Sequence, residues 1–292
     1  MPGMDDWPTG KVESVAPLVR RLLAPNPSPF TYTGTQTYLV GSGAPGGEVA
    51  VIDPGPDLPE HVDAILAATA GERVAAILCT HTHRDHSPAS RPLAAATGAP
   101  IIGCAPLALE DEGPRADAAF DFAYAPDRAL ADGEAVQGEG WILRALATPG
   151  HTSNHLCFAL DGTGILFTGD HVMGWSTTVV SPPDGDMTAY MASLDLLLSR
   201  DDSIYHPAHG PAVANPRRHV RALIAHRRMR EKQILRRIEA GEGYIPCMVA
   251  ALYRDVDPRL HGAAGRSVLA HLEDLARRGL VRNEGEAWIS NG

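Results

Sequence analysis

Thr80-His81-Thr82-His83-Arg84-Asp85-His86 directly follows an unbroken apolar run, Val74 to Cys79, which is typical of a strand buried on both faces. In an extended segment residues two apart project to the same side, so His81 and His83 can converge on one ion, and Asp85 keeps the same parity. Imidazole and carboxylate ligands at this density suit zinc, or else iron or manganese. A solvated polar loop would explain a single His, but not three His and one Asp within six residues. The heptapeptide therefore predicts a metal site at a strand end.

Three more candidate ligands follow other predicted strands. His151 comes after the strand expected at Trp141 to Leu146, Asp170 ends a strand that begins at Ile165, and His209 follows the last short strand. Each of these residues stands next to Gly or Pro, at the end of an apolar run. Because several strand ends can meet at one rim of a sheet, distant parts of a sequence can build one site there. We therefore expect these residues to join the His81 to His86 segment.

The pattern resembles the metallo-β-lactamase-fold hydrolase superfamily, from about Thr35 to Gly210. The resemblance implies an α/β (α+β) fold, the αββα four-layer sandwich. The family's H-x-H-x-D-H motif matches His81, His83, Asp85 and His86, and its later ligand positions match His151, Asp170 and His209. The resemblance further implies that His81, His83 and His151 bind one metal ion, that Asp85, His86 and His209 bind the other, and that Asp170 bridges both.

Charge and periodicity divide the chain in two. Residues 1–215 carry 10 basic and 26 acidic side chains, a balance of −16, whereas residues 216–292 carry 15 and 9, a balance of +6. In the first part, strands form a meander, then alternate with helices, then meander again, which favours mixed sheets covered by helices. After residue 216, three helices precede a short strand, the order expected of a winged-helix module. We expect a catalytic domain at 1–215 and a winged-helix domain at 216–292.

Within that superfamily, the sequence looks most like the beta-lactamase-like protein 2 group, which carries such a C-terminal domain. The likeness rests on the Thr80 to Ser87 string, the Gly169 to Val180 segment and the basic C-terminal domain. Members of that group include single-strand RNA endonucleases, so one expected substrate is single-stranded RNA.

The resemblance implies a hydrolase with two divalent metal ions, Zn²⁺ first, with Mn²⁺ or Fe as options. Two close cations would acidify a bridging water to hydroxide, which would attack a phosphoryl or carbonyl centre. Asp85 is both a ligand and the candidate catalytic residue that orients this hydroxide and takes its proton. Phosphodiester cleavage of RNA is the first hypothesis, and hydrolysis of a thioester, lactone or other small acyl ester is the alternative. The charge of −16 argues against a polyanion, but two bound divalent cations would return about +4 locally, so the charge does not decide between the two substrates.

Two rival functions stay open. A persulfide-dioxygenase-like oxidoreductase uses this fold with a single iron, but it would not need the complete second ligand set found here. A non-catalytic binding protein would show loss of ligands, and the sequence shows none.

Four other residues are candidates for supporting roles. Asp53 follows a strand and either fixes a ligand His or forms an Asx turn. Trp175 and Thr177 lie in a long segment after Asp170 that either covers the site or simply leads to the next helix. His206 either lines the pocket or packs beneath it. His155 and His171 sit beside motif residues, where extra histidines more often support a site or lie at the surface than bind metal.

The remaining features concern partners and location. The arginines after residue 216 predict a solvated helix face, and attraction of a phosphate backbone is the alternative. Winged helices also serve in oligomerisation, so a homodimer is one expected assembly. The four cysteines are far apart and no apolar run is long enough to cross a bilayer, which indicates a cytoplasmic protein with no membrane partner.

Overall fold

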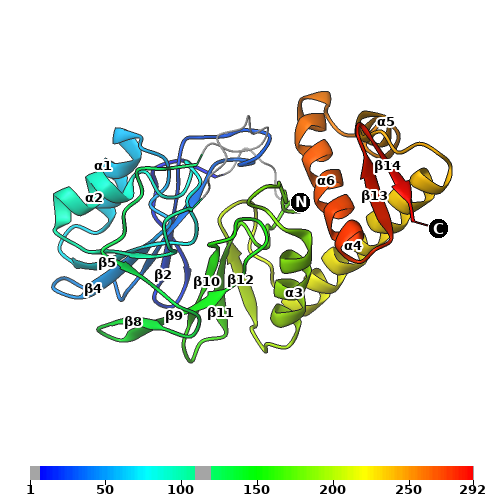
Figure 1. Cartoon of the computed structure of the whole chain (residues 1–292). Coiled ribbons are helices and arrows are strands. Elements are labelled where there is room, and N and C mark those ends of the chain that lie inside the picture. Colours follow the sequence, from blue (N-terminus) through cyan, green and yellow to red (C-terminus); the bar gives the residue numbers. More distant parts are fainter. Residues whose placement is uncertain (1–6, 109–119, 292) are drawn as a thin grey trace.

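The computed structural model describes residues 7–108 and 120–291, and it contains two sheets packed face to face with helices outside them (Figure 1). The larger sheet is mixed, antiparallel from its first strand to its fourth and parallel from there on. Its strands lie side by side in chain order: β1 (Glu13–Ala16), β2 (Val19–Leu23), β3 (Gln36–Val40), β4 (Glu48–Ile52), β5 (Arg73–Cys79), β6 (Ile101–Gly103) and β7 (Arg128–Ala129).

In the smaller sheet, too, strands that are consecutive in the sequence are neighbours. Its pairs are antiparallel except the last, in which β11 and β12 are parallel. Its strands are β12 (Ile204–Pro207), β11 (Ile165–Gly169), β10 (Leu156–Leu160), β9 (Trp141–Ala147) and β8 (Ala135–Gly138). A helix separates β11 from β12, as a parallel crossover requires.

The inner faces of the two sheets form the main core. Tyr38 of β3 meets Phe167 of β11 with ring centroids 5.0 Å apart, and Leu78, Leu143 and Phe158 are fully buried around them. Both sheets also carry apolar side chains on their outer faces, so the central strands read as continuous apolar runs. This explains why β5 has no alternation in its sequence.

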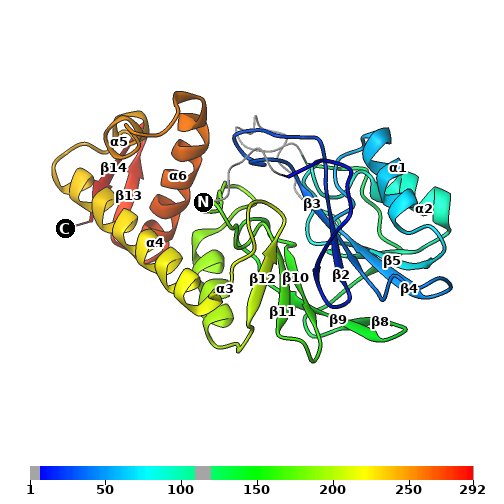
Figure 2. The same cartoon turned by 180° about the vertical axis from the view of Figure 1, so that it is seen from behind.

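Helices cover the outer faces of both sheets. On one side α1 (Pro59–Ala68) and α2 (Ser90–Thr97) bury Ile65 and Leu93 against the larger sheet. On the other side α3 (Met187–Leu198) and the first half of α4 (Pro216–Glu239) bury Tyr190 and Val220 against the smaller sheet. Seen from behind, the same four layers are visible (Figure 2). The expected αββα sandwich is confirmed.

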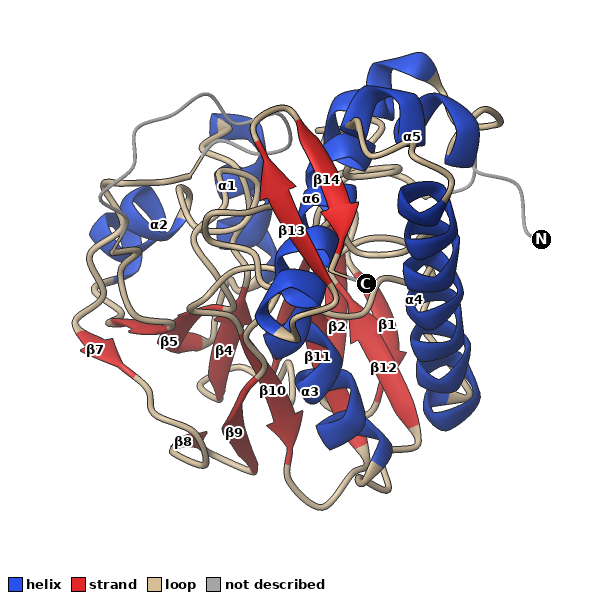
Figure 3. Ribbon diagram, turned by 45° about the vertical axis from the view of Figure 1, so that its right-hand side comes forward, coloured by secondary structure: helices blue, strands red, loops and turns tan. Residues whose placement is uncertain are grey.

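The C-terminal part is a second, smaller fold beside the sandwich (Figure 1), and in the view of Figure 3 it lies in front of the sandwich. The second half of α4 contributes Ile234 and Ile238 to a core that also holds Val268 and Trp288. The expected winged helix is confirmed, with a two-stranded wing. Its remaining elements are α5 (Ile245–Leu252), the short 3₁₀ helix η2 (Pro258–Leu260), α6 (His261–Arg277), β13 (Val281–Glu284) and β14 (Ala287–Ser290).

Helix α4 belongs to both parts of the molecule. Its 24 residues begin at Pro216, with the Asn215 side chain accepting from the backbone of Arg218. The first half packs on α3 and the second half packs in the winged-helix core. The domain division before residue 216 stays a prediction, because one continuous helix joins the two cores. None of the described helices combines the length and the apolarity that crossing a bilayer requires.

His271 of α6 makes the join between the two parts sensitive to acid. Its side chain is buried, and neither ring nitrogen has a hydrogen-bond partner. Burial, followed by the charges of Arg227 and Arg230, lowers its pKa to about 3. Below pH about 6.5 the unfolded chain therefore binds a proton that the folded chain does not, and stability falls as the pH falls.

We expect His271→Leu to reduce this acid sensitivity. The free energy of unfolding is measured by urea denaturation at several pH values. Below pH about 6.5, that of the wild type should fall faster than that of the variant, by at most about 1.4 kcal/mol for each pH unit. A His261→Asn variant on the same helix, where the side chain is half-buried, serves as the control. An equal loss of stability between pH 7 and pH 5 in wild type and His271→Leu would contradict the assignment.

Candidate metal centre

All seven predicted ligand residues lie together at one rim of the sandwich. The loop after β5 supplies four of them, and one each follows β9, β11 and β12. These loops can approach one another closely because position 169 is a glycine. Its φ is +48°, and a Cβ at this position would clash with the Thr80 side chain. The ligand atoms fall into two groups: His81, His83, His151 and Asp170 in the first, and Asp85, His86 and His209 in the second.

In the first group three imidazoles face one another. His81 Nε2 lies 2.9 Å from His83 Nδ1, and His151 Nε2 lies 3.0 Å from the same atom. Asp170 Oδ2 lies 3.5 Å from His151 Nε2. Ligand atoms about 2.0–2.2 Å from one tetrahedral ion lie roughly 3.3–3.6 Å from each other, so these separations are close to what a zinc ion requires.

The second group shares Asp170 with the first. Asp170 Oδ1 lies 3.2 Å from His209 Nε2 and 3.5 Å from His86 Nε2. Asp85 Oδ2 lies 3.2 Å and 3.4 Å from the same two nitrogens. One oxygen of Asp170 therefore faces each group, which is the arrangement expected of a carboxylate between two ions.

Hydrogen bonds on the outer side of four of the rings hold Nδ1 and turn Nε2 toward the ligand groups. His151 donates its Nδ1–H to the carbonyl of Val179 (2.6 Å), and His209 donates to that of Gly34 (3.3 Å). His81 Nδ1 lies 3.0 Å from Thr80 Oγ1, and His86 Nδ1 lies 3.0 Å from Asp53 Oδ2. Each of these four histidines thus directs Nε2 at its ligand group, and the neutral ring with its proton on Nδ1 is the form that binds metals.

The chemistry of this donor set fits divalent cations. Among the described side chains, His86 Nε2 and Asp170 Oδ1 are buried without a hydrogen-bond partner, and they lie 3.5 Å apart where the two groups meet. Unpaired polar atoms in such positions cost free energy unless a ligand satisfies them. The two His/Asp groups are thus consistent with a dinuclear metal site.

Electrostatics separate the two groups. Burial lowers the pKa of His81 and of His83 well below the ordinary value, so both rings are neutral. Burial also opposes a charge on His209, but Asp170 and Asp85 outweigh it and raise its pKa to about 10. Without cations the carboxylates thus hold protons on the second group, and metal ions would replace these protons.

Asp53 ties the two groups together from behind. Its Oδ1 accepts from the backbone N–H of Thr80 (2.8 Å), and its Oδ2 accepts from the Thr80 hydroxyl (2.8 Å) and from His86. Because the Thr80 hydroxyl accepts in turn from His81, one carboxylate orients a histidine of each group. These contacts correspond to the first alternative for Asp53, support of a ligand His.

We therefore expect Asp53→Ala to weaken metal binding by about 10- to 100-fold, the usual cost of losing an outer partner of a ligand. The dissociation constant for Zn²⁺, measured by competition with a chromophoric chelator, is the readout. Asp57→Asn, at an exposed position on the next turn of chain, is the matched control. Unchanged Zn²⁺ affinity in Asp53→Ala would contradict the positioning role.

His155 is a supporting residue whose role was hard to predict from the sequence. Its Nε2 accepts the backbone N–H of Asp170 (3.2 Å), while its Nδ1–H points to Thr148 Oγ1 (2.9 Å). The ring therefore fixes the backbone that carries the shared carboxylate. The available signal was its position, four residues after His151 and at the start of β10. His171 instead packs against the Tyr190 ring at 4.9 Å.

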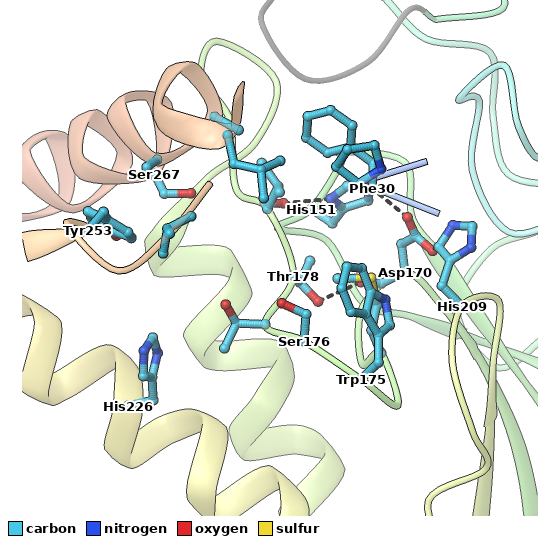
Figure 4. A pocket seen from close by; sticks show the side chains of 18 of the residues that line it. Phe30, His151, Asp170, Trp175, Ser176, Thr178, His209, His226, Tyr253 and Ser267 are labelled. Carbon is cyan, nitrogen blue, oxygen red and sulfur yellow. Dashed lines mark hydrogen bonds and ion pairs between the residues drawn. The ribbon is translucent and has the colours of Figure 1, made fainter. Parts of the chain in front are cut away.

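A cavity of about 280 Å³ opens from the two groups toward the winged-helix domain (Figure 4). His83, Asp85, His151, Asp170 and His209 face it from the sandwich. Apolar side chains line the opposite side, from the segment before α6 and from α6 itself: Val256, Leu260, Ala263 and Ala264. The catalytic rim and the second domain therefore enclose one shared pocket.

The segment after Asp170 forms part of this pocket. Trp175 and Thr177 both line it, and Trp175 stacks on Tyr32 with ring centroids 4.9 Å apart. His206 is not among the lining residues. It is buried between Tyr38 and Phe167, at ring distances of 5.5 and 5.9 Å, so its surroundings match the packing alternative.

The expectation of a solvated basic face on α4 is wrong at two positions. Arg227 and Arg230 are buried and line the pocket, whereas Arg217, Arg218, Arg221 and Arg228 are exposed as expected. The signal was present in the sequence, because positions 227 and 230 continue the helical spacing of Val220, Leu223 and Ile224.

Two family models match the chain. The model described as the metallo-beta-lactamase superfamily matches residues 31–209, and the model described as the beta-lactamase associated winged helix domain matches residues 245–288. The first match contains every residue of the two ligand groups.

Similar proteins include fungal enzymes and a bacterial structure. A protein of Aspergillus chevalieri named atrochrysone carboxyl ACP thioesterase is 35% identical over 97% of this chain and 86% of its own length. A protein of the same name from Aspergillus fumigatus is 34% identical over 77% of this chain and 66% of its own. The crystal structure of a beta-lactamase domain protein from Burkholderia ambifaria superposes with TM-score 0.79 at 20% identity, covering 98% and 96% of the two chains, and shows the same two-part fold.

Proposed function

The chain belongs to the metallo-beta-lactamase superfamily, as a metal-dependent hydrolase, and on that basis we propose that it hydrolyses the thioester bond of an acyl group attached to a carrier thiol. The observation that carries this proposal is the shared pocket, in which the two ligand groups face an apolar surface of the winged-helix domain. An acyl group can rest on that surface while its thioester carbon lies at the ligand groups.

The relatives support the same substrate class. Proteins named as ACP thioesterases match this chain at 34–35% identity, and one of these matches covers 97% of this chain. The thioester alternative is therefore better supported than cleavage of single-stranded RNA. The charges agree, because several outward arginines are paired with acids, as in Arg217–Asp201 and Arg278–Glu231, and are not free for a phosphate backbone.

The ligand residues define how the reaction would proceed. Two divalent cations held by the seven ligands, Zn²⁺ first, would activate water and polarise the thioester carbonyl. Asp85 lines the pocket and is about one quarter exposed. Burial raises its pKa, but His86 and His209 outweigh this effect and hold the pKa well below the ordinary value, so Asp85 is ionised. The ionised form and the place of Asp85 in the pocket lining allow it to orient the attacking water, and we propose that it accepts the proton of that water.

The reaction consumes one water molecule for each thioester. The water oxygen bonds to the carbonyl carbon, the C–S bond breaks, and the thiolate takes up a proton to leave as the thiol, with a carboxylic acid as the other product. Thr148, Asp53 and His155 hold the ligand loops in place and do not enter the reaction.

A substrate panel tests this proposal. The purified chain loaded with Zn²⁺ is offered hexanoyl-N-acetylcysteamine, bis(p-nitrophenyl) phosphate, a single-stranded RNA oligonucleotide and a γ-lactone. We expect release of free thiol from the thioester, with kcat/KM well above that of the other three. Cleavage of the RNA or the phosphate diester without turnover of the thioester would overturn the proposal in favour of the phosphodiesterase hypothesis.

A further inference from the structure

Two arginines are buried in the wall of the pocket. Arg227 and Arg230 stand three residues apart on α4, so their side chains leave the same face of the helix. They are 3% and 9% exposed, and both line the cavity that contains Asp85 and Asp170. Buried guanidinium groups are rare in proteins unless they are paired with an anion.

Neither arginine has such a partner within the described part of the chain. Arg227 donates to the carbonyl of Thr178, and Arg230 donates to the carbonyl of Leu252 at 2.9 Å. Their guanidinium carbons lie 5.1 Å and 4.0 Å from the rings of Tyr190 and Tyr253. No described carboxylate comes within ion-pair distance of either, and the Nε of each is buried without a hydrogen-bond partner.

Their neighbours add no negative charge. His226, next to Arg227, also lines the pocket, and burial together with the charges of Arg227 and Arg230 lowers its pKa, so the ring is neutral. The carboxylates among the lining residues are Asp85 and Asp170, and both belong to the ligand groups. Ser176 and Ser267 also line the pocket (Figure 4), and their hydroxyl groups offer further hydrogen-bond donors.

We propose that Arg227 and Arg230 form a subsite for an anionic group of the substrate, a phosphate or a carboxylate. The planar guanidinium suits both anions, because its N–H groups can bind two oxygens at once. The identity of the substrate as a carrier-bound thioester rests on the proposed function. Such a substrate offers two sources for the anion: the phosphate of a phosphopantetheine group, or a carboxylate on the acyl group.

Four thioesters distinguish these sources. Hexanoyl-N-acetylcysteamine and hexanoyl-pantetheine carry no charge, hexanoyl-4′-phosphopantetheine adds a phosphate, and adipoyl-N-acetylcysteamine adds a carboxylate to an acyl group of equal length. We expect one of the two charged substrates to have a KM about 10- to 100-fold lower than its uncharged counterpart, as a charged hydrogen-bonded contact allows. In Arg227→Gln and Arg230→Gln this ratio should fall toward one.

Matched variants control for folding. Arg228→Gln removes an exposed arginine next to Arg227 and should keep the wild-type ratio. Arg227→Lys keeps the charge but not the planar group and should retain part of the preference. If Arg227→Gln does not fold, Arg230→Gln and Arg227→Lys decide the question. Equal KM values for charged and uncharged substrates in the wild type, or an unchanged ratio in the glutamine variants, would overturn the proposal.

A binding measurement separates this inference from the proposed function. Calorimetric titration of the Zn²⁺-loaded chain with 4′-phosphopantetheine and with adipate needs no turnover. If no thioester is hydrolysed but one probe binds the wild type and not Arg230→Gln, the anion subsite stands and the thioesterase proposal fails. If thioesters are hydrolysed and neither probe binds, the subsite is contradicted and the thioesterase proposal stands.

Discussion

Replacing Asp170 by Asn should lower hydrolytic kcat/KM by roughly 10³-fold or more, since the loss of even one electrostatic contact to a transition state costs about 10²- to 10³-fold. The reason is its central position. Oδ1 lies 3.2 Å from His209 Nε2, while Oδ2 lies 3.5 Å from His151 Nε2. An amide replaces one oxygen by an NH₂ group, which cannot bind a cation.

The same variant should bind fewer metal ions. Because each oxygen of Asp170 faces a different ligand group, Asp170→Asn should lower the affinity for both metal ions or abolish binding of one of them. Metal content per chain and kcat/KM for hexanoyl-N-acetylcysteamine are measured on one preparation. Asp161→Asn, in the exposed turn between β10 and β11, is the control and should match the wild type. Wild-type activity in Asp170→Asn would refute a shared carboxylate.

Removal of metal by a chelator is the second change with a large expected effect. Activity should fall to background, and the unfolding temperature should fall by roughly 10 °C. A ligand whose free concentration is about 1,000 times its Kd stabilises the folded protein by about 4 kcal/mol. In a catalytic domain of this size, each kcal/mol corresponds to about 2–4 °C.

Hydrogen exchange and add-back make the chelation test specific. Faster exchange should be confined to the loops that carry the ligands, above all residues 80–86 and 149–152, with α1 and α2 unchanged. Two equivalents of Zn²⁺ should restore both activity and unfolding temperature. Metal-free protein with full activity and unchanged melting would contradict the account.

The seven ligand residues were predictable from the sequence because each is marked by the few residues before it. The strand before His81 is buried on both faces and is therefore an apolar run, and each later ligand stands at the end of a similar run. The shared position after a strand end allowed the seven residues to be grouped before any coordinates, and the structure brings the end of β5 in the larger sheet and the ends of β9, β11 and β12 in the smaller sheet to one rim of the sandwich. The family match and the four-layer fold confirm that interpretation of the fold.

Strands at or next to a sheet edge were harder to predict. β1 and β2 pair with each other through a tight turn at Leu18 (φ +64°), yet their sequence ESVAPLVRRLL is only partly apolar. The wing strand β14 (Ala287–Ser290) was missed for the same reason. Side chains of such strands face solvent on one side, so their composition carries little information.

The pocket depends on tertiary contacts that no local pattern contains. The first turns of helix α6, which begins at His261, pack against the pocket and α5 and contain small residues, so no apolar spacing marks them in the sequence. Burial of Arg227 and Arg230 likewise depends on where α4 crosses the loop at Thr178. Only the helical spacing of these arginines was visible in the sequence.

The central claim is that this chain is a dinuclear metal hydrolase of thioesters. Its most direct test is the number and identity of metal ions per chain, determined by mass spectrometry on protein purified without added metal, together with thioester turnover by the same sample. We predict two ions, Zn²⁺ first and Mn²⁺ or Fe otherwise, with release of thiol from hexanoyl-N-acetylcysteamine. A single iron per chain with consumption of oxygen and no thioester hydrolysis would contradict the account and favour the persulfide-dioxygenase-like alternative.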